Sequence, residues 1–335
     1  MATAPVRLAG AFRTALLRAG ADPTYADGDD ATWVGVDWRS LQRTLEIDGR
    51  QVNVLDTGPP AGARGPGPAL LFIHGWSSNW QIFLLNIAAF MDTHRVLSLD
   101  LPGFGASAMP AEPISIRRYA RTVDAVCDAL GVERVVAVGN SMGGFIGAEL
   151  ALSFGTRVDR LVLISAAGLS TGALPRRPIL TAAQLVGTGS RRATFLQGPV
   201  VRRPRLRRAA MQWVVRYPER LSVPLSEELV LSFAKPGFVD ALRAIMDYDY
   251  RDRLPEIEIP VLIVWGRQDL LVPVSDADAY AALIGPNARV VVFEDTGHVP
   301  MLERPSRFNE LLRGFLAGED APEAGVPGIA RATAS

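Results

Sequence analysis

The most informative stretch of the sequence reads Val138-Gly139-Asn140-Ser141-Met142-Gly143-Gly144. An apolar, β-branched run precedes it over residues 134–138, and a run with helical character follows it to about residue 154. A serine in a tight turn from a strand into a helix is strained, and the flanking glycines remove side chains that would collide with the neighbouring backbone. The helix start directs free N–H groups and the positive end of its dipole towards developing negative charge. We therefore expect Ser141 to be held at the edge of a sheet as a nucleophile.

Short apolar runs of the same kind recur along the chain, with helical stretches between them. They cover Ala69–Ile73, Arg95–Leu99, Arg134–Val138, Arg160–Ile164, Pro260–Trp265 and Arg289–Phe293. These runs lack polar alternation, which is typical of parallel strands that helices cover on both faces. Asp48-Gly49, within residues 45–55, predicts an antiparallel hairpin before them. The sequence thus predicts an α/β fold with a mostly parallel, doubly wound sheet.

The alternation of strands and helices stops between about residues 168 and 254, where only helical segments are expected. This helical insertion follows the sixth predicted strand, so it emerges at the carboxyl edge of the sheet, where open α/β sheets bind ligands. We interpret residues 169–251 as a lid over a core formed by residues 40–168 and 252–317. The two ends are predicted to be a partly helical N-terminal extension, residues 1–39, and a disordered tail rich in Ala, Gly and Pro, residues 318–335.

Composition argues against several classes of protein. Lys plus Arg and Asp plus Glu both total 35, so the net charge of zero gives no indication of nucleic-acid binding. The single cysteine, Cys127, leaves no intrachain disulfide, and no apolar run approaches the ~20 residues of a membrane span. The N-terminus lacks the apolar core and cleavage site of a secretory signal, so we expect a cytoplasmic protein. Within this N-terminal segment, four apolar residues fall on one face of a predicted helix: Leu8, Phe12, Leu16 and Leu17. This face could pack on the domain or lie in a membrane interface.

A serine nucleophile needs a base, and the chain holds only three histidines, His74, His94 and His298. His298 follows the last predicted strand and therefore reaches the carboxyl edge of the sheet. His94 precedes a strand, which places it at the opposite edge as a surface residue. His74 ends a strand and is followed by Gly75-Trp76, so we expect it to shape the loop around the oxyanion. These positions favour His298 as the general base.

The imidazole needs an acid to fix its tautomer, and Asp269 comes directly after a predicted strand in Gly266-Arg-Gln-Asp269. The order Ser141, Asp269, His298 is the one expected for a nucleophile elbow of this kind. Asp295 and Glu303 are near His298 in sequence, but closeness along a loop does not aim a carboxylate at the ring. We predict that those two are cap or surface groups.

Two backbone N–H groups, those of Trp76 and Met142, are predicted to hold the oxyanion. Positions in the loops predict six residues that contact the substrate: His74, Gly75, Trp80, Phe104, Trp213 and Val299. The mechanism needs no metal and no organic cofactor, so we expect neither.

Five segments, in this order, resemble the α/β-hydrolase superfamily in its serine esterase and lipase branch over about residues 45–315. They are His74-Gly75-Trp76, Asp100-Leu-Pro-Gly-Phe-Gly-Ala-Ser107, Gly139-Asn-Ser-Met-Gly143, Gly266-Arg-Gln-Asp269 and Gly297-His-Val-Pro-Met-Leu-Glu-Arg-Pro305. The resemblance implies the α/β-hydrolase fold and serine-dependent hydrolysis of a small-molecule carboxylic ester. Serine at 141 departs from the aspartate nucleophile of epoxide hydrolases and haloalkane dehalogenases, which argues against those activities.

Several activities within this branch remain open. Ser165-Ala-Ala-Gly-Leu169 and the run after His298 are similar to monoacylglycerol lipases and carboxylesterases, which favours medium or long acyl esters such as acyl glycerols. Gly139–Gly144 is also similar to the carbon–carbon bond hydrolases that cleave meta-cleavage products, but Trp76-Ser-Ser-Asn-Trp80 replaces their usual Gly-Pro-Gly. His74–Trp76 with Asp100–Gly105 is similar to esterases of carrier-bound acyl chains. Acyl transfer, or a receptor role on the same scaffold, is a further alternative.

The predicted lid is basic. Between residues 176 and 220 it contains eleven arginines and a single acid, Glu219. The arginines are Arg176, Arg177, Arg191, Arg192, Arg202, Arg203, Arg205, Arg207, Arg208, Arg216 and Arg220. Such a run predicts peripheral contact with an anionic membrane or an acidic carrier protein. The alternative is a solvated arginine face that acids elsewhere in the fold balance.

Overall fold

The computed structural model describes residues 24–27, 33–61, 67–173, 176–192, 201–230, 235–319 and 329–330. Over these ranges the strands form one nine-stranded sheet in the order β1-β2-β4-β3-β5-β6-β7-β8-β9. They are β1 Gln42–Ile47, β2 Arg50–Asp56, β3 Ala69–Ile73, β4 Val96–Leu99, β5 Val135–Asn140, β6 Val158–Ile164, β7 Val261–Gly266, β8 Ala288–Phe293 and β9 Ile329–Ala330. Strands β3 to β8 pair in parallel, whereas β1, β2 and β9 are antiparallel to their neighbours. The predicted mostly parallel α/β sheet is thereby confirmed.

The first two strands form the expected hairpin. Asp48 and Gly49 connect them with φ angles of 50° and 68°. Positive φ at both central residues matches the right-handed twist of the flanking strands, and an aspartate–glycine pair tolerates it best. The hairpin prediction is confirmed at the expected turn.

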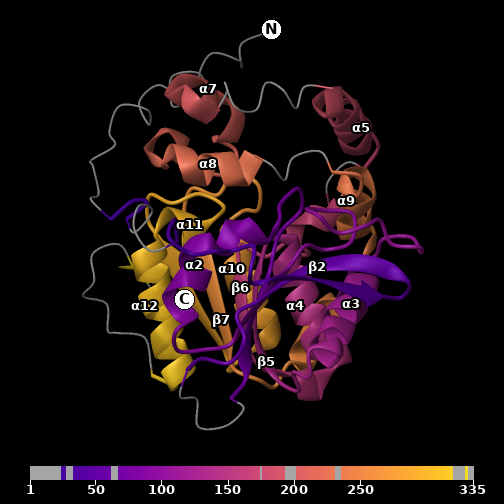
Figure 1. Cartoon of the computed structure of the whole chain (residues 1–335), viewed down its shortest axis with the longest axis vertical. Coiled ribbons are helices and arrows are strands. Elements are labelled where there is room, and N and C mark those ends of the chain that lie inside the picture. The colour runs from indigo at the N-terminus through magenta and orange to yellow at the C-terminus, as the bar shows by residue number, and fades with distance from the viewer. Residues whose placement is uncertain are drawn as a thin grey trace, which may run out of the picture.

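Helices cover both faces of the sheet (Figure 1). The first face packs against α3 Ile116–Ala129, α4 Met142–Ser153 and α10 Ser275–Ile284, and the second against α2 Leu84–Phe90, α11 Pro300–Glu303 and α12 Pro305–Ala317. Successive residues of β3 alternate between the two cores: Leu71 and Ile73 join the first, Leu70 and Phe72 the second. All four are fully buried, which explains why the sequence shows no polar alternation there.

The insertion between β6 and β7 is helical where the structure describes it. Its elements are η3 Ser170–Ala173, α5 Arg176–Arg192, α7 Pro204–Met211, η5 Pro218–Arg220, α8 Val223–Val230 and α9 Phe238–Asp247, and η6 Arg251–Glu256 leads into β7. Figure 1 shows α5, α7, α8 and α9 together beyond one end of the sheet. Hydrogen bonds tie the insertion to the loops after β3 and β8. They include the bond from the Trp76 side chain to the Phe238 carbonyl and the bond from the His298 amide to the Val214 carbonyl.

Both chain ends lie partly outside the described residues. Residues 24–27 and 33–40 consist of turns and bends, with Tyr25 and Trp33 buried against the domain, and the helix expected within residues 1–20 lies outside the described residues. In the tail, Ile329–Ala330 pairs with Phe293 and Val292 at the outer edge of β8. Disorder was therefore wrong for these two residues, because an edge strand offers unpaired backbone groups to a passing segment.

One insertion arginine is structural. Arg207 is 3% exposed and donates to the carbonyls of Pro218, Val201 and Glu219 at 2.8, 2.9 and 2.8 Å. We expect Arg207→Met to destabilise this part of the insertion by about 3 kcal/mol, because it leaves buried carbonyls without donors. Urea-dependent limited proteolysis within residues 201–220 measures the effect.

The adjacent Arg208 provides the control. Its guanidinium pairs with Glu219 at 2.7 Å but its side chain is 35% exposed, so Arg208→Met should cost no more than about 1 kcal/mol. Equal losses in the two variants would contradict the role assigned to Arg207.

Candidate active site

The turn from β5 into α4 has the strain that the sequence predicts. Ser141 has φ 55° and ψ −117°, and its carbonyl accepts a hydrogen bond from the Ala167 amide at 3.1 Å. A Cβ atom on Gly139 would lie 2.2 Å from the Gly143 carbonyl oxygen, and one on Gly143 would lie 2.0 Å from the Ile73 carbonyl oxygen. Only glycine fits either position. Ser141 itself stays partly exposed at the carboxyl end of the strand.

His298 and Asp269 form a hydrogen-bonded pair. The His298 Nδ1 atom lies 2.7 Å from Asp269 Oδ2, and the two side chains are 5% and 0% exposed. The other carboxylate oxygen, Oδ1, accepts from the amides of Leu271 and Val272 at 2.8 and 3.0 Å. With these donors on Oδ1, Oδ2 is directed at the ring and Nδ1 carries the proton. This tautomer leaves Nε2 able to accept a proton.

The backbone of His298 is held from two sides. Its amide donates to the Val214 carbonyl at 3.0 Å, and its carbonyl accepts from the Asn140 side chain at 3.2 Å. Asn140 also donates to the Ile164 carbonyl at 3.2 Å, so one amide group links the ends of β5 and β6 to the histidine loop. This role of Asn140 was not predicted from the sequence. The feature of the sequence that could have indicated this role is the position of Asn140 immediately before Ser141.

The predicted oxyanion loop passes close to the nucleophile. A Cβ atom on Gly75 would lie 3.1 Å from Ser141 Cβ, so the backbone at this position leaves little room beside the serine. The next residue, Trp76, is fixed through its indole, which donates to the Phe238 carbonyl at 2.6 Å and packs on the Phe238 ring at 4.2 Å between centroids. Met142 is the first residue of α4, where amide groups have no partner within the helix.

His74 supports the loop and has no free nitrogen. Its Nδ1 lies 2.7 Å from the Gly75 carbonyl oxygen, and its Nε2 accepts from the Leu101 amide at 2.9 Å. Since an amide can only donate, Nε2 is unprotonated and Nδ1 donates to the carbonyl. Burial lowers the pKa of His74, against the opposing effect of the Asp100 carboxylate, so the ring is neutral. His94 lies half-buried before β4, at the opposite edge of the sheet from Ser141.

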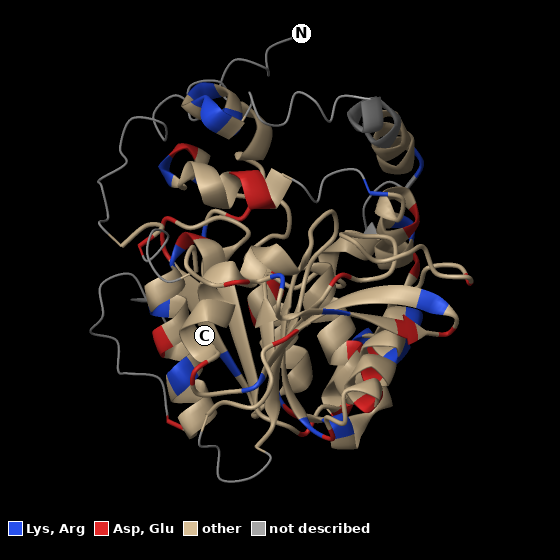
Figure 2. Cartoon of the chain, viewed as in Figure 1, with Lys and Arg blue, Asp and Glu red and all other residues tan. Residues whose placement is uncertain are grey.

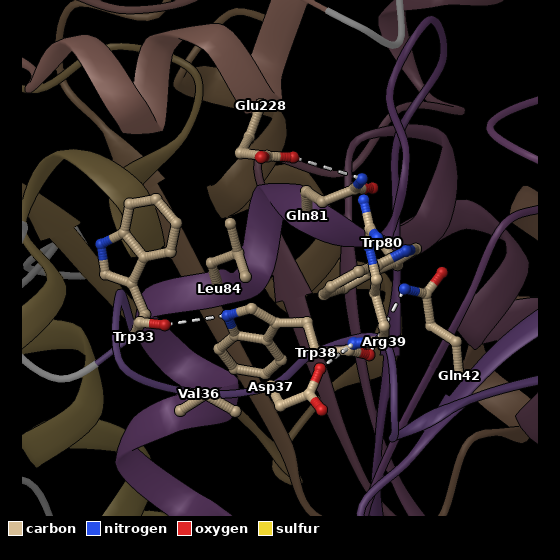
Figure 3. A pocket seen from close by; sticks show the side chains of 10 residues that line it. All are labelled: Trp33, Val36, Asp37, Trp38, Arg39, Gln42, Trp80, Gln81, Leu84 and Glu228. Carbon is tan, nitrogen blue, oxygen red and sulfur yellow. Dashed lines mark hydrogen bonds between the residues drawn. The ribbon is translucent and has the colours of Figure 1, made fainter.

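The predicted substrate contacts differ widely in exposure. Phe104 and Val299 are buried at 0% and 1% exposure, whereas Trp213 is 59% exposed in the turn after α7. Trp80 is 3% exposed and borders a pocket of about 440 Å³ between the N-terminal segment, the start of α2 and α8. Figure 3 shows the residues that line it: Trp33, Val36, Asp37, Trp38, Arg39, Gln42, Trp80, Gln81, Leu84 and Glu228. The lining includes none of Ser141, Asp269 and His298.

Glu303 is not a surface group, and it is a cap, which is one of the two predicted alternatives: its carboxylate accepts from the amide of Val299, the residue before the start of α11. It is fully buried, and its carboxylate accepts from the amides of Gly297 and Val299, which flank His298. The geometry follows from its position on α11, where a side chain reaches back to free amides before the helix start. Asp295 remains partly exposed, accepts from the Tyr217 hydroxyl at 2.7 Å and does not contact the His298 ring in any hydrogen bond of the described residues.

Comparison with known proteins agrees with this geometry. The family model described as alpha/beta hydrolase fold matches residues 68–305. The chain is 34% identical to a 2-hydroxy-6-oxononadienedioate/2-hydroxy-6-oxononatrienedioate hydrolase of Paraburkholderia phymatum, covering 83% of this chain and 98% of that protein.

Two solved structures are similar as well. One, an N-acyl homoserine lactone degrading enzyme, has 30% identity and a TM-score of 0.64 and covers 82% of this chain and 100% of that one. The other, a bacterial membrane phospholipase A, has 28% identity and a TM-score of 0.64, with 83% and 86% covered. Since the family model alone spans more than half of the sequence, the chain belongs to the α/β-hydrolase fold family and is a hydrolase of that family.

Proposed function

We propose that this enzyme hydrolyses carboxylic esters through an acyl-enzyme on Ser141. The observation that carries the proposal is the combination of a strained serine at the β5–α4 turn with a histidine whose Nδ1 lies 2.7 Å from a buried aspartate. This is the arrangement that activates a hydroxyl as a nucleophile without a cofactor.

The geometry supports a two-step reaction. The Ser141 oxygen attacks the ester carbonyl carbon while His298 Nε2 takes the hydroxyl proton, and the amides of Trp76 and Met142 stabilise the negative oxygen. The carbon–oxygen bond to the alcohol then breaks, and His298 returns the proton to the leaving alcohol. Water attacks the acyl-enzyme in the same way, giving its proton to His298, which passes it to Ser141 as the carboxylic acid leaves. Asp269 stabilises the imidazolium in both steps.

The helical insertion is proposed to act as a lid over an acyl pocket. Its contacts support this role, because α9 holds the indole of Trp76, the residue after Gly75, and the Val214 carbonyl holds the His298 amide. In this proposal the substrates carry medium or long acyl chains, as acyl glycerols do, and the apolar chain lies beneath these helices. The pocket residues predicted from the sequence, Trp80, Phe104, Trp213 and Val299, remain a prediction.

Contact of the insertion with an anionic membrane or an acidic carrier is also a proposal. Part of its charge is offset, since Arg202 pairs with Glu227 at 3.0 Å and Arg208 with Glu219 at 2.7 Å. Exposed Arg203 and Arg205 at α7 supply the positive charge for such a contact (Figure 2). Within the described ranges, no helix has both the length and the apolar character that crossing a bilayer demands.

Carbon–carbon bond hydrolysis is the second candidate. The observation that favours it is the 34% identity, over 83% of this chain and 98% of the other, to a 2-hydroxy-6-oxononadienedioate/2-hydroxy-6-oxononatrienedioate hydrolase. In that reaction the same serine, histidine and aspartate act on a ketone carbonyl of the substrate in place of an ester carbonyl.

One set of assays separates the two. Wild type and Ser141→Ala are tested with p-nitrophenyl esters from acetate to palmitate, with 1-monoacylglycerols and with a 2-hydroxy-6-oxo-dienoic acid. We expect serine-dependent ester hydrolysis with an optimum in chain length. Cleavage of the dienoic acid alone would replace the ester proposal by the second candidate, and no cleavage of any substrate would reject both.

A further inference from the structure

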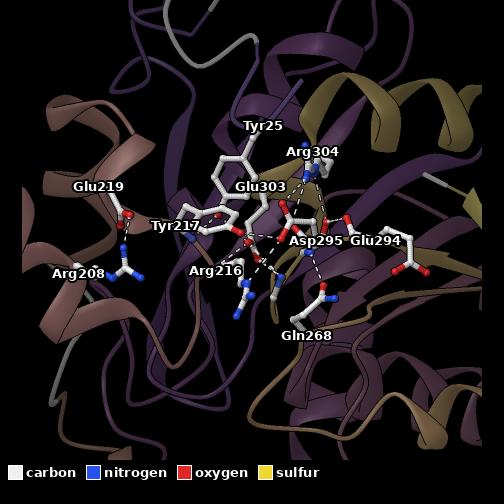
Figure 4. A network of polar contacts seen from close by, with 12 residues as sticks. Tyr25, Arg208, Arg216, Tyr217, Glu219, Gln268, Glu294, Asp295, Glu303 and Arg304 are labelled. Atoms are coloured by element: carbon white, nitrogen blue, oxygen red, sulfur yellow. Dashed lines mark hydrogen bonds and ion pairs between the residues drawn. The ribbon is translucent and has the colours of Figure 1, made fainter. Parts of the chain in front are cut away.

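A fully buried carboxylate lies behind the catalytic histidine. Glu303 is 0% exposed, and its oxygens accept five hydrogen bonds from four groups. These donors are the Tyr25 hydroxyl at 2.7 Å, the Arg216 amide at 2.9 Å, the Gly297 amide at 3.0 and 3.1 Å and the Val299 amide at 3.3 Å. Since amide and hydroxyl groups all donate here, the site fits an ionised carboxylate. Three separate parts of the chain therefore meet at one side chain: the N-terminal segment, the insertion and the histidine loop (Figure 4).

Tyr25 completes this junction. Its hydroxyl donates to Glu303 and accepts from the Tyr217 amide at 2.8 Å, so a single oxygen joins the histidine loop to the insertion. Its ring is 5% exposed, packs edge-on against the Tyr217 ring at 5.2 Å, and lies near the guanidinium groups of Arg220 and Arg304 at 5.2 and 4.9 Å. These contacts leave the hydroxyl little freedom to move.

Residues 214–217 of the insertion form a strap along the histidine loop. The Val214 carbonyl accepts from the His298 amide, the Arg216 amide donates to Glu303, and the Tyr217 amide donates to Tyr25. The Tyr217 hydroxyl adds a bond to Asp295 at 2.7 Å. The strap thus holds the backbone on which the catalytic ring is mounted, and Tyr25 and Glu303 hold the strap.

We propose that Tyr25 is a positioning residue for catalysis, which locks the strap and the His298 loop together through Glu303. This inference rests on the triad of the proposed function. It makes the N-terminal segment part of the catalytic framework, although that segment is distant in sequence from every residue of the triad. A shift of about 1 Å in a catalytic group can lower turnover by as much as 10²-fold, so loosening the strap should affect rate more than substrate binding.

The charge of Glu303 gives the lock a pH dependence. Burial raises the pKa of Glu303, while hydrogen bonds from Tyr25 and from the amides of Arg216, Gly297 and Val299 lower it. Charged or titratable groups close to the junction are Arg216, Arg220, Asp295, His298 and Arg304. Removing the Tyr25 hydroxyl removes one lowering contribution, so the pKa of Glu303 should rise further. The carboxylate would then take up a proton at a higher pH than in wild type. The groups around the protonated carboxyl are hydrogen-bond donors, so the added proton finds no acceptor among them.

The test is Tyr25→Phe, which deletes one oxygen and keeps the ring. We expect kcat to fall about tenfold with KM within twofold of wild type, and the acid limb of the kcat profile to move to higher pH. The control is Tyr119→Phe, since Tyr119 is also buried and its hydroxyl donates once, to the Pro102 carbonyl at 3.1 Å. Tyr119→Phe should have the same kcat as wild type, and the acid limb of its kcat profile should lie at the same pH.

Amide hydrogen exchange gives a readout that does not depend on substrate. The amides of Arg216, Tyr217, Gly297, His298 and Val299 all donate within the junction, so they should exchange faster in Tyr25→Phe and not in Tyr119→Phe. Wild-type kcat, acid limb and exchange in Tyr25→Phe would overturn the inference and leave the proposed function standing. If wild type cleaves neither substrate class, the proposed function fails, and the exchange rates alone then decide whether the lock exists.

Discussion

Ser141→Ala should lower turnover by about 10⁴-fold or more, with no change in fold. The substitution removes the only oxygen that this turn presents as a nucleophile, while alanine keeps the Cβ atom and the backbone conformation. His298 and Asp269 then remain paired but have no hydroxyl to activate. Turnover is measured with the ester that wild type cleaves best, and near-ultraviolet circular dichroism checks the fold.

Ser165→Ala is the matched control for this variant. Ser165 directly follows β6, next to the turn that holds Ser141. It also has positive φ, at 45°, and is fully buried, with no hydrogen-bond partner for its hydroxyl among the described residues. Its loss should leave turnover within a few-fold of wild type, because no step uses that oxygen. Full activity in Ser141→Ala, or an equal loss in Ser165→Ala, would remove the assignment of Ser141 as nucleophile.

The features that the sequence predicts well are local ones. The strand at Ala69–Ile73 has the predicted bounds because a run buried on both faces consists of apolar residues alone. The turn at Ser141 was predictable because its steric demand acts on residues two positions away, and glycine is the only solution to that demand. Asp269 and His298 were predictable because parallel strands bring every loop after a carboxyl end to the same edge.

Features that depend on distant partners were not predictable from one sequence. Glu303 is far from Tyr25 along the chain, and nothing in either local sequence indicates that the tyrosine hydroxyl reaches the carboxylate. The same holds for Asn140, whose side chain bonds to the His298 carbonyl across 158 residues of sequence separation. The two-residue strand β9 also lies beyond prediction, because its only signal is the free edge of β8.

The second large effect is expected for Asp269→Asn, which should lower kcat by about 10⁴-fold with little change in KM. The amides of Leu271 and Val272 donate to Oδ1 and need an oxygen there, so the asparagine carbonyl takes that place. Its NH₂ group then faces His298 Nδ1 in place of Oδ2. A donor in that position forces the proton of the imidazole onto Nε2, the nitrogen that must accept the Ser141 proton. The rate is measured by pre-steady-state release of p-nitrophenol, which reports acylation directly.

Asp276→Asn makes the same change at a carboxylate outside the triad. Asp276 is 6% exposed and accepts from the Ser170 amide at 3.0 Å, so it resembles Asp269 in burial and in bonding to backbone but has no contact with the histidine. If the tautomer of His298 is what Asp269 controls, only Asp269→Asn slows acylation, and both variants keep the thermal stability of wild type within a few degrees. A comparable loss in both would attribute the effect to a buried carboxylate in general, and a fast Asp269→Asn enzyme would mean that another group orients the imidazole.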